Sequence, residues 1–215
     1  MHNRGVYLKA MKLRAIIRSF FVSRGYLECE TPILVRTPGL EANLFPFETE
    51  LTSFDGQTAR AGLITSPEFS LKKILGPEFP KIFELARVFR NHEPRDATHN
   101  PEFTLLEWYQ TGLDYQGLMT ETEELIKFCA GSFGCEKVKV SGREVDLCRG
   151  FERLTVSNAF YKYCGFHLSE SLDKTTLAIQ AAKLGITTES TDSYDDIFFR
   201  IFLSKIESAL GFPCP

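Results

Sequence analysis

The sequence predicts an α+β fold in which an antiparallel sheet is flanked by helices. Two segments, 81–93 and 101–110, alternate bulky apolar with other side chains, and a polar loop joins them, as expected for a β-hairpin with a long tip. Amphipathic segments precede and follow this hairpin, and several of them end at glycine, which is typical of helix C-termini. The 215 residues suit one large domain, or one domain with a smaller appendage.

The chain before the hairpin begins with a predicted helix and a predicted strand. Apolar residues recur close to helical spacing over 7–24, and Gly25 follows as the C-terminal cap. Residues 26–35, YLECETPILV, have the apolar and β-branched content of a strand. Pro32 restricts this strand to an edge or an interface, because proline cannot donate to a β-ladder.

A loop and a strand–helix unit are predicted next. Residues 37–51 carry the proline and glycine of a loop. In residues 62–75, GLITSPEFSLKKIL, a short strand leads into a helix. Ser66 can cap this helix, and Pro67 fits its first position.

The chain after the hairpin is predicted to be mostly helical. An amphipathic helix is expected over 114–131, and a small hairpin with a Ser-Gly turn over 134–147. Three further segments are predicted to be helices, each closed by glycine: 155–165, 173–185 and 192–211.

Composition narrows the class of protein. The net charge of −3 gives no basic excess of the kind that marks compact nucleic-acid binders. No apolar run approaches the length of a membrane span, and the charged N-terminus does not resemble a secretory signal. The six cysteines include no Cys-x-x-Cys pair, so we expect reduced thiols in a cytoplasmic protein and no metal site.

The two hairpin strands carry a set of groups suited to an anionic and a cationic ligand. Arginine holds phosphate or carboxylate through a planar fork of donors, which suits Arg90, and the loop cation Arg95 can add to it. On the partner strand, Phe103 can stack on a base, while Glu107 and Tyr109 can reach an ammonium group. These residues predict a nucleotide-plus-amine site on a sheet; the alternative is an exposed hairpin with a solvated tip.

The sequences of the two hairpin strands, FELARVFRNHE and HNPEFTLLEWY, resemble motif 2 of class II aminoacyl-tRNA synthetases of the lysine type. The resemblance extends over roughly residues 8–130. The strand GYLECETPIL resembles motif 1, which forms the dimer interface, and TSPEFSLKKIL resembles the substrate-contacting loop and helix. The resemblance implies the antiparallel sheet of a class II synthetase.

Within this family the chain resembles the short lysine-tRNA-ligase-like enzymes that modify elongation factor P. Its tryptophan in LLEWY is similar to theirs, and its first helix begins too near Met1 to leave room for an anticodon-binding barrel. The resemblance implies that ATP and lysine or β-lysine give an aminoacyl-adenylate, whose acyl group passes to a lysine of elongation factor P. Two alternatives stay open: a lysine-tRNA ligase-type fragment, or a non-catalytic truncated paralogue that binds a ligand or partner.

The resemblance also implies roles for residues that would bind ATP. Arg90 matches the catalytic arginine that bridges the α-phosphate and the substrate carboxylate. Phe103 matches the aromatic residue that stacks on adenine. His99 matches a residue near the γ-phosphate, and Asn100 helps to set its turn.

The amino-acid end of the implied site comes from two segments. Ser66, Pro67 and Glu68 match the family's Ser-Pro-Glu substrate contact. Glu107 matches the acid that meets the α-ammonium group, and Tyr109 a hydroxyl partner at the same end. Two acids suit a diammonium ligand, because each buried cation needs a counter-charge.

One departure from the family concerns the adenine contact. The family has Arg-Asn-Glu, whereas this chain has Arg90, Asn91, His92 and then Glu93. Strand alternation puts His92 on the side of Arg90 and turns Glu93 away. Either a bulge turns Glu93 inward, or His92 or the backbone lies against the base, which we favour.

The second departure is the end of the resemblance. The family continues with metal-binding acids and motif 3, for which this chain has no matching residues, so the sheet is expected to be incomplete. Mg²⁺ is expected in the complete enzyme, with ligands outside this chain. We expect residues 1–150 to form the class II synthetase-like catalytic core with motifs 1 and 2, residues 151–215 to be a helical segment of the same domain, and motif 1 to form a homodimer.

Overall fold

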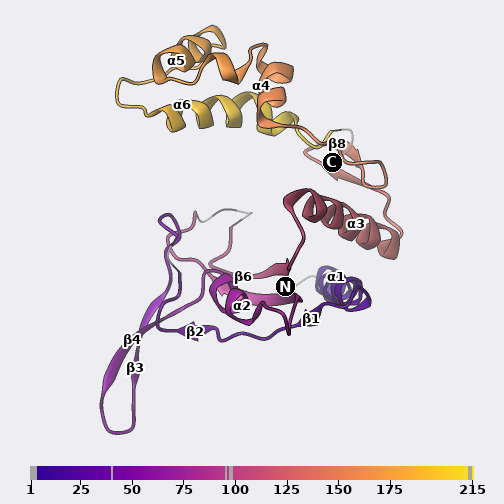
Figure 1. The fold of residues 1–215 in the computed structure, drawn as a ribbon, viewed down its shortest axis with the longest axis vertical. Helices are drawn as coiled ribbons and strands as arrows, with labels where there is room; N and C mark the ends of the chain where they lie inside the picture. The colour runs from indigo at the N-terminus through magenta and orange to yellow at the C-terminus, as the bar shows by residue number, and fades with distance from the viewer. Residues whose placement is uncertain (1–3, 40, 95, 97–98, 213–214) are drawn as a thin grey trace. The chain divides into compact units, whose positions relative to one another are not determined.

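The computed structural model describes residues 4–39, 41–94, 96, 99–212 and 215. They form a mixed fold of helices and antiparallel strand pairs, which confirms the predicted class (Figure 1). The chain groups into two compact units, Met1–Leu125 and Ile126–Pro215, which are described separately below. The domain boundary near residue 150 stays a prediction.

The first unit contains the helices and strands on which the candidate site depends. Their bounds are α1 Arg4–Ser23, β1 Leu27–Glu28, β2 Leu34–Val35, β3 Glu48–Thr52, β4 Thr58–Leu63, α2 Glu68–Ile74, β5 Lys81–Phe89, β6 Glu102–Gln110 and α3 Tyr115–Phe133, which continues into the second unit.

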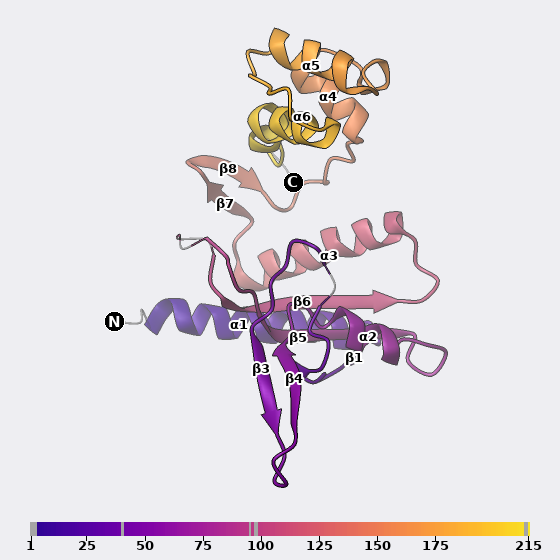
Figure 2. The ribbon, with the colours of Figure 1, turned by 90° about the vertical axis from the view of Figure 1, so that its left-hand side faces the viewer.

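The predicted hairpin is the centre of this unit. β5 and β6 pair antiparallel along their whole length, from Lys81 opposite Gln110 to Phe89 opposite Glu102. β1 pairs with β5 in parallel, which gives the sheet order β1-β5-β6. The prediction of an antiparallel sheet therefore holds for β5 and β6 but not for β1. A second sheet has the order β2-β4-β3, and Figure 2 shows its β3–β4 hairpin projecting from the rest of the unit.

Two local predictions need correction. The strand predicted over 26–35 is two short strands, because the N–H of Thr31 leaves the ladder and donates to the Glu84 carboxylate at 3.0 Å, and Pro32 has no N–H to offer. Part of the loop predicted over 37–51 is strand β3. All of β3 is exposed at a sheet edge, so its sequence has no buried face to produce an apolar alternation.

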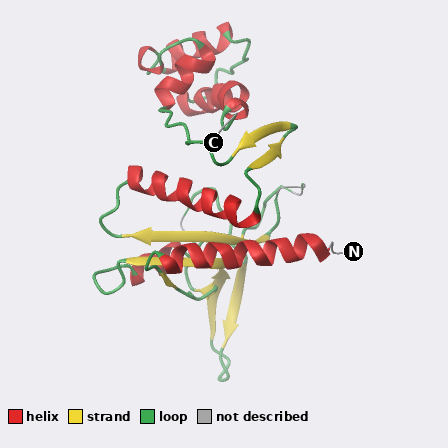
Figure 3. Cartoon of the chain, turned by 90° about the vertical axis from the view of Figure 1, so that its right-hand side faces the viewer, coloured by secondary structure: helices red, strands yellow, loops and turns green. Residues whose placement is uncertain are grey.

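Helix α1 packs against one face of the β5–β6 hairpin. Figure 3 shows this helix running alongside the strands. The ring of Phe21 stacks on Phe83 of β5, with centroids 4.9 Å apart, and lies 5.4 Å from Trp108 of β6. Phe20, Phe21 and Phe83 have no exposed surface. This apolar contact occupies one face of the hairpin and leaves the other for the polar groups.

The start of α3 is joined to the same face by hydrogen bonds. The indole N–H of Trp108 donates to Glu121 at 2.9 Å, and the hydroxyl of Tyr26 donates to the same carboxylate at 2.7 Å. Burial and the Glu121 carboxylate raise the pKa of Tyr26 well above its usual value, which keeps the phenol protonated as a donor.

The second unit confirms the predicted small hairpin and three helices. Its elements are β7 Lys137–Val140, β8 Arg143–Asp146, α4 Val156–Cys164, a 3₁₀ turn Leu168–Glu170, α5 Lys174–Lys183, α6 Tyr194–Ile201, a π-helical turn Phe202–Ile206 and a 3₁₀ turn Glu207–Ala209. Ser141 and Gly142 both have positive φ, as a two-residue hairpin turn requires. The last predicted helix is therefore regular only as far as Ile201.

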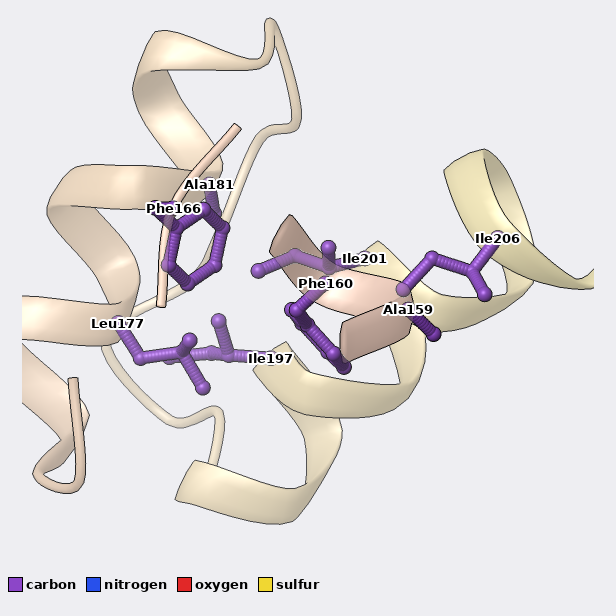
Figure 4. Packing of buried hydrophobic residues seen from close by; sticks show 8 residues of the cluster. All are labelled: Ala159, Phe160, Phe166, Leu177, Ala181, Ile197, Ile201 and Ile206. Atoms are coloured by element: carbon purple, nitrogen blue, oxygen red, sulfur yellow. The ribbon is translucent and has the colours of Figure 1, made fainter. Parts of the chain in front are cut away.

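Local capping and a common apolar core explain these three helices. Thr155, Asp173 and Ser193 each accept a hydrogen bond from a backbone N–H in the first turn of their helix. Figure 4 shows the buried side chains that α4, α5 and α6 contribute, including Phe160, Leu177 and Ile197. The helices thus bury their apolar faces against one another.

Two further expectations can be compared with the described residues. The five cysteines described are free thiols, as predicted: Cys29, Cys129, Cys135, Cys148 and Cys164. Among the described helices, none combines the length and apolar content needed to cross a bilayer.

The apolar core of the second unit can be tested with two leucines in adjoining segments. Leu177 is fully buried, whereas Leu172 is 72% exposed. We expect Leu177→Ala to destabilise α4–α6 by about 2–5 kcal/mol, because it leaves a cavity. The matched Leu172→Ala variant should change stability by less than about 0.5 kcal/mol. Hydrogen exchange of residues 156–201, measured by mass spectrometry on the full chain, distinguishes them; equal protection in both variants would contradict the core assignment.

Candidate active site

The strand register brings Arg90 and Phe103 to one side of the sheet. Val88 lies directly opposite Phe103, and directly opposed residues of an antiparallel pair share a face. The N–H of Arg90 continues this pairing by donating to the carbonyl of Pro101 at 3.0 Å. The Arg90 Cζ atom lies 5.2 Å from the centroid of the Phe103 ring, and its Nε donates to the Thr65 carbonyl at 3.4 Å. The predicted pairing of guanidinium and phenyl groups is therefore present.

Glu107 occupies the other end of the same face. One of its carboxylate oxygens accepts a hydrogen bond from the Ser66 hydroxyl at 2.8 Å, and the other accepts from the Tyr109 hydroxyl. Burial, followed by the bond to Glu107, raises the pKa of Tyr109 well above its usual value, so this phenol stays a donor. Three predicted substrate-binding residues thus form one hydrogen-bonded group.

Ser66, Pro67 and Glu68 connect this group to α2. The Ser66 hydroxyl also accepts a bond from the Glu68 N–H at 3.0 Å, but Ser66 precedes the N-cap position that was predicted for it. Pro67 lies at the N-cap, one position before the predicted one. Glu68 begins α2, and its carboxylate forms an ion pair with Lys72, one turn along the helix.

Lys72 is a site neighbour that the sequence analysis did not include. Its ammonium group pairs with Glu68 and lies 5.7 Å from the centroid of the Tyr109 ring, within the range of a cation–π interaction. The bond to Glu68, with a smaller contribution from the charge of Glu107, raises the pKa of Lys72. The i,i+4 spacing of Glu68 and Lys72 is the signal that would have identified this pair.

The departure at His92 has a structural cause. The N–H of Asn91 bonds to the Phe45 carbonyl at 2.7 Å, and the Asn91 side chain accepts from the N–H of His92 at 3.0 Å. His92 has a φ of 60°, and its ring stacks on Phe45 with centroids 4.8 Å apart. This left-handed turn interrupts the alternation from which the side of His92 was predicted. Whether His92 or the half-buried Glu93 contacts adenine stays a prediction.

The tip of the hairpin holds the remaining predicted ATP ligands. His99 is hydrogen-bonded to Asp96, with its Nδ1 atom 2.9 Å from a carboxylate oxygen, and Asn100 is exposed beside it. The contact with Asp96 supports the turn itself, and a role of His99 at the γ-phosphate stays a prediction. Arg95 lies outside the described residues.

Glu84 is a second residue to which the sequence analysis gave no role. It lies directly opposite Glu107, is only 5% exposed, and accepts a bond from Thr31 with one oxygen, while its other oxygen has no hydrogen-bond partner in the described structure. Burial raises the pKa of this carboxyl above its usual value. Its place on the site face, beside Glu107, follows from strand alternation once the register is known.

Comparison with known proteins identifies the family. A family model described as tRNA synthetases class II (D, K and N) matches residues 4–199. The chain belongs to this family.

Named relatives of this class II synthetase chain fall into two groups. It is 34% identical over 214 residues to an elongation factor P--(R)-beta-lysine ligase of Proteus mirabilis, which is 97% of this chain and 59% of that protein. It is 36% identical over 208 residues to a lysine--tRNA ligase of Thermoanaerobacter pseudethanolicus, which is 95% of this chain and 40% of that protein. The chain therefore spans about half the length of the relatives it matches.

The described part of this class II synthetase chain does not offer a set of metal ligands. Among the described residues, no three histidine, cysteine, aspartate or glutamate side chains are grouped so that they could hold a metal ion. The ligands of the Mg²⁺ that is expected in the complete enzyme stay a prediction.

The buried carboxyl group of Glu84 predicts an effect of pH on stability. The pKa of Glu84 is raised in the folded state, so this carboxyl group stabilises the fold at pH values below its unfolded-state pKa, near 4.5. That stabilisation is lost as the pH rises through the folded-state pKa. We expect Glu84→Gln to remove this loss, so the variant's stability relative to the wild type increases from pH 4 to pH 7. Urea unfolding followed by fluorescence of the single tryptophan, Trp108, measures it.

A surface carboxylate provides the control for this prediction. Glu50 lies on the exposed strand β3, so Glu50→Gln should not reproduce the pH-dependent gain. A Glu84→Gln variant whose stability follows that of the wild type in parallel from pH 4 to pH 7 would contradict the raised pKa.

Proposed function

We propose that this chain activates lysine or β-lysine with ATP, forming an aminoacyl-adenylate, and passes the acyl group to a lysine of elongation factor P. The proposal rests on one observation: a guanidinium group, an aromatic ring and a hydroxyl-bonded carboxylate share one face of the hairpin. An anion-binding end and a cation-binding end on one surface suit a ligand that carries both charges.

Arg90 is the residue to which this proposal gives the catalytic role. The substrate carboxylate forms a bond to the α-phosphorus while the bond to pyrophosphate breaks, so no protein nucleophile is needed. Arg90 compensates the negative charge that develops at phosphorus, and Phe103 supports the base. Positioning and charge compensation carry such a reaction.

The amino-acid end is proposed to hold the ammonium groups. Glu107 is kept in place by donors on both oxygens, from Ser66 and Tyr109, and both donors are themselves held by the fold. Glu68 adds a second carboxylate from the start of α2. A diammonium ligand thereby receives a counter-charge for each cation.

The acceptor, the assembly and the location are further parts of the proposal. The resemblance of LLEWY to the short enzymes and relatives named as elongation factor P ligases support the protein acceptor. Relatives named as lysine--tRNA ligases make tRNA the second candidate. Ile33 and the first residue of β2, Leu34, are exposed at 41% and 42%, which suits a homodimer through motif 1 in a cytoplasmic enzyme.

An exchange assay and a transfer assay test the function. Lysine- or β-lysine-dependent exchange between ATP and labelled pyrophosphate is expected, and the activated acyl group should move to elongation factor P. Transfer to tRNA and not to elongation factor P would identify tRNA as the acceptor instead. Lysine and ATP binding without exchange would favour the non-catalytic alternative.

Two arginines of one strand separate the catalytic role from general charge. Arg90 lies beside Phe103, whereas Arg87 lies directly opposite Thr104 on the other face and pairs with Glu102. We expect Arg90→Ala to lower the exchange rate by about 10²–10³-fold, as for loss of one transition-state donor. Arg87→Ala should change it by less than about threefold, because exposed ion pairs contribute little. Similar losses in both variants would remove the role from Arg90.

A second prediction concerns the acid of α2. We expect Glu68→Gln to weaken binding of lysine by about tenfold or more, since a charged hydrogen bond is lost, and to leave the Kd for ATP unchanged. Calorimetric titration of each ligand measures both constants. The control Glu78→Gln, in the turn before β5, should change neither. Equal loss of both ligands in the Glu68 variant would indicate misfolding instead.

A further inference from the structure

The amino-acid end of the site already contains a cation. The Lys72 ammonium group pairs with Glu68 and faces the Tyr109 ring, whose hydroxyl in turn donates to Glu107. Its charge is close enough to Glu107 for that carboxylate to favour its protonated form. The ammonium of Lys72 thus lies among the groups to which the proposed function assigns the ammonium groups of the substrate.

In the free protein, the carboxylate of Glu68 already has a cationic partner, whereas each oxygen of Glu107 accepts one hydroxyl bond and keeps a further acceptor position. A diammonium ligand that entered beside Lys72 would place three cations against two carboxylates. Like charges at such distances repel by amounts comparable to the attraction that an ion pair gains.

We propose that Lys72 is a built-in competitor for the substrate, which occupies an ammonium subsite in the free protein and is displaced when lysine or β-lysine binds. This inference rests on the proposed function. Lys72 is suited to leave, since its side chain is 53% exposed and flexible, and release into water returns rotamer freedom. While it occupies the subsite, it neutralises Glu68 and disfavours the binding of other small cations.

Removing the Lys72 ammonium group should have opposite effects on lysine binding, depending on whether it competes with the substrate or only orients Glu68. If Lys72 competes, Lys72→Gln strengthens lysine binding, because the substrate no longer has to break an ion pair. If Lys72 only orients Glu68, the same change weakens binding. The adjacent Lys73 lies in the same last turn of α2, so Lys73→Gln removes an equal charge a short distance from the subsite.

Calorimetric titration of L-lysine into the full chain tests this inference. The expected result is a Kd lower by about two- to fivefold in Lys72→Gln, the range that breaking an exposed ion pair allows, and unchanged in Lys73→Gln. A second measurement is the Nζ resonance of Lys72 in the wild type, which should shift at saturating lysine while that of Lys73 stays. An unchanged or higher Kd, or an equal gain in Lys73→Gln, would overturn the inference.

The two proposals fail in distinguishable ways. Absence of lysine binding by both the wild type and the Lys72 variant would refute the proposed function itself. Lysine binding by the wild type with no gain in Lys72→Gln would refute the competitor inference and leave the proposed function standing.

Discussion

The antiparallel register of β5 and β6 is the constraint on which the candidate site depends. Successive side chains of a strand point to opposite faces, so a slip of one residue would turn Phe103, Glu107 and Tyr109 toward α1. The packing of Phe83 and Trp108 against α1 opposes such a slip, because it would also move these apolar rings to the wrong face. The core on one side of the hairpin therefore fixes the site on the other.

Elements with a long, regular pattern could be predicted from the sequence, whereas short or exposed ones could not. β5 and β6 each offer nine residues of alternation, and α4–α6 have side-chain caps and apolar faces. Neither face of strand β3 is buried, so its sequence carries no apolar alternation. It forms a strand because it pairs with β4, which no local pattern in the sequence indicates. Pro32 indicated a special position but not the Thr31–Glu84 contact that divides the strand.

The candidate site was predictable to the extent that it lies within one hairpin. Alternation alone put Arg90 on its face, and the resemblance supplied the roles of the residues. Contacts between distant segments were beyond this reasoning: Ser66 meets Glu107 across 41 residues, and Phe45 stacks on His92. The left-handed backbone of His92 was equally hidden, since a positive φ is uncommon for any residue other than glycine.

The order of charges along the face is also what keeps the site available to a ligand. Phe103, which Arg90 touches, and Glu107 lie four residues apart on β6, about 13 Å at the rise of a β-strand. Had the guanidinium been adjacent to this carboxylate, the two would form a bidentate ion pair and satisfy each other. Their separation leaves a cationic end and an acidic end, and the acids are instead engaged by hydroxyls and by the exposed ammonium group of Lys72, partners that an amino acid can replace or share.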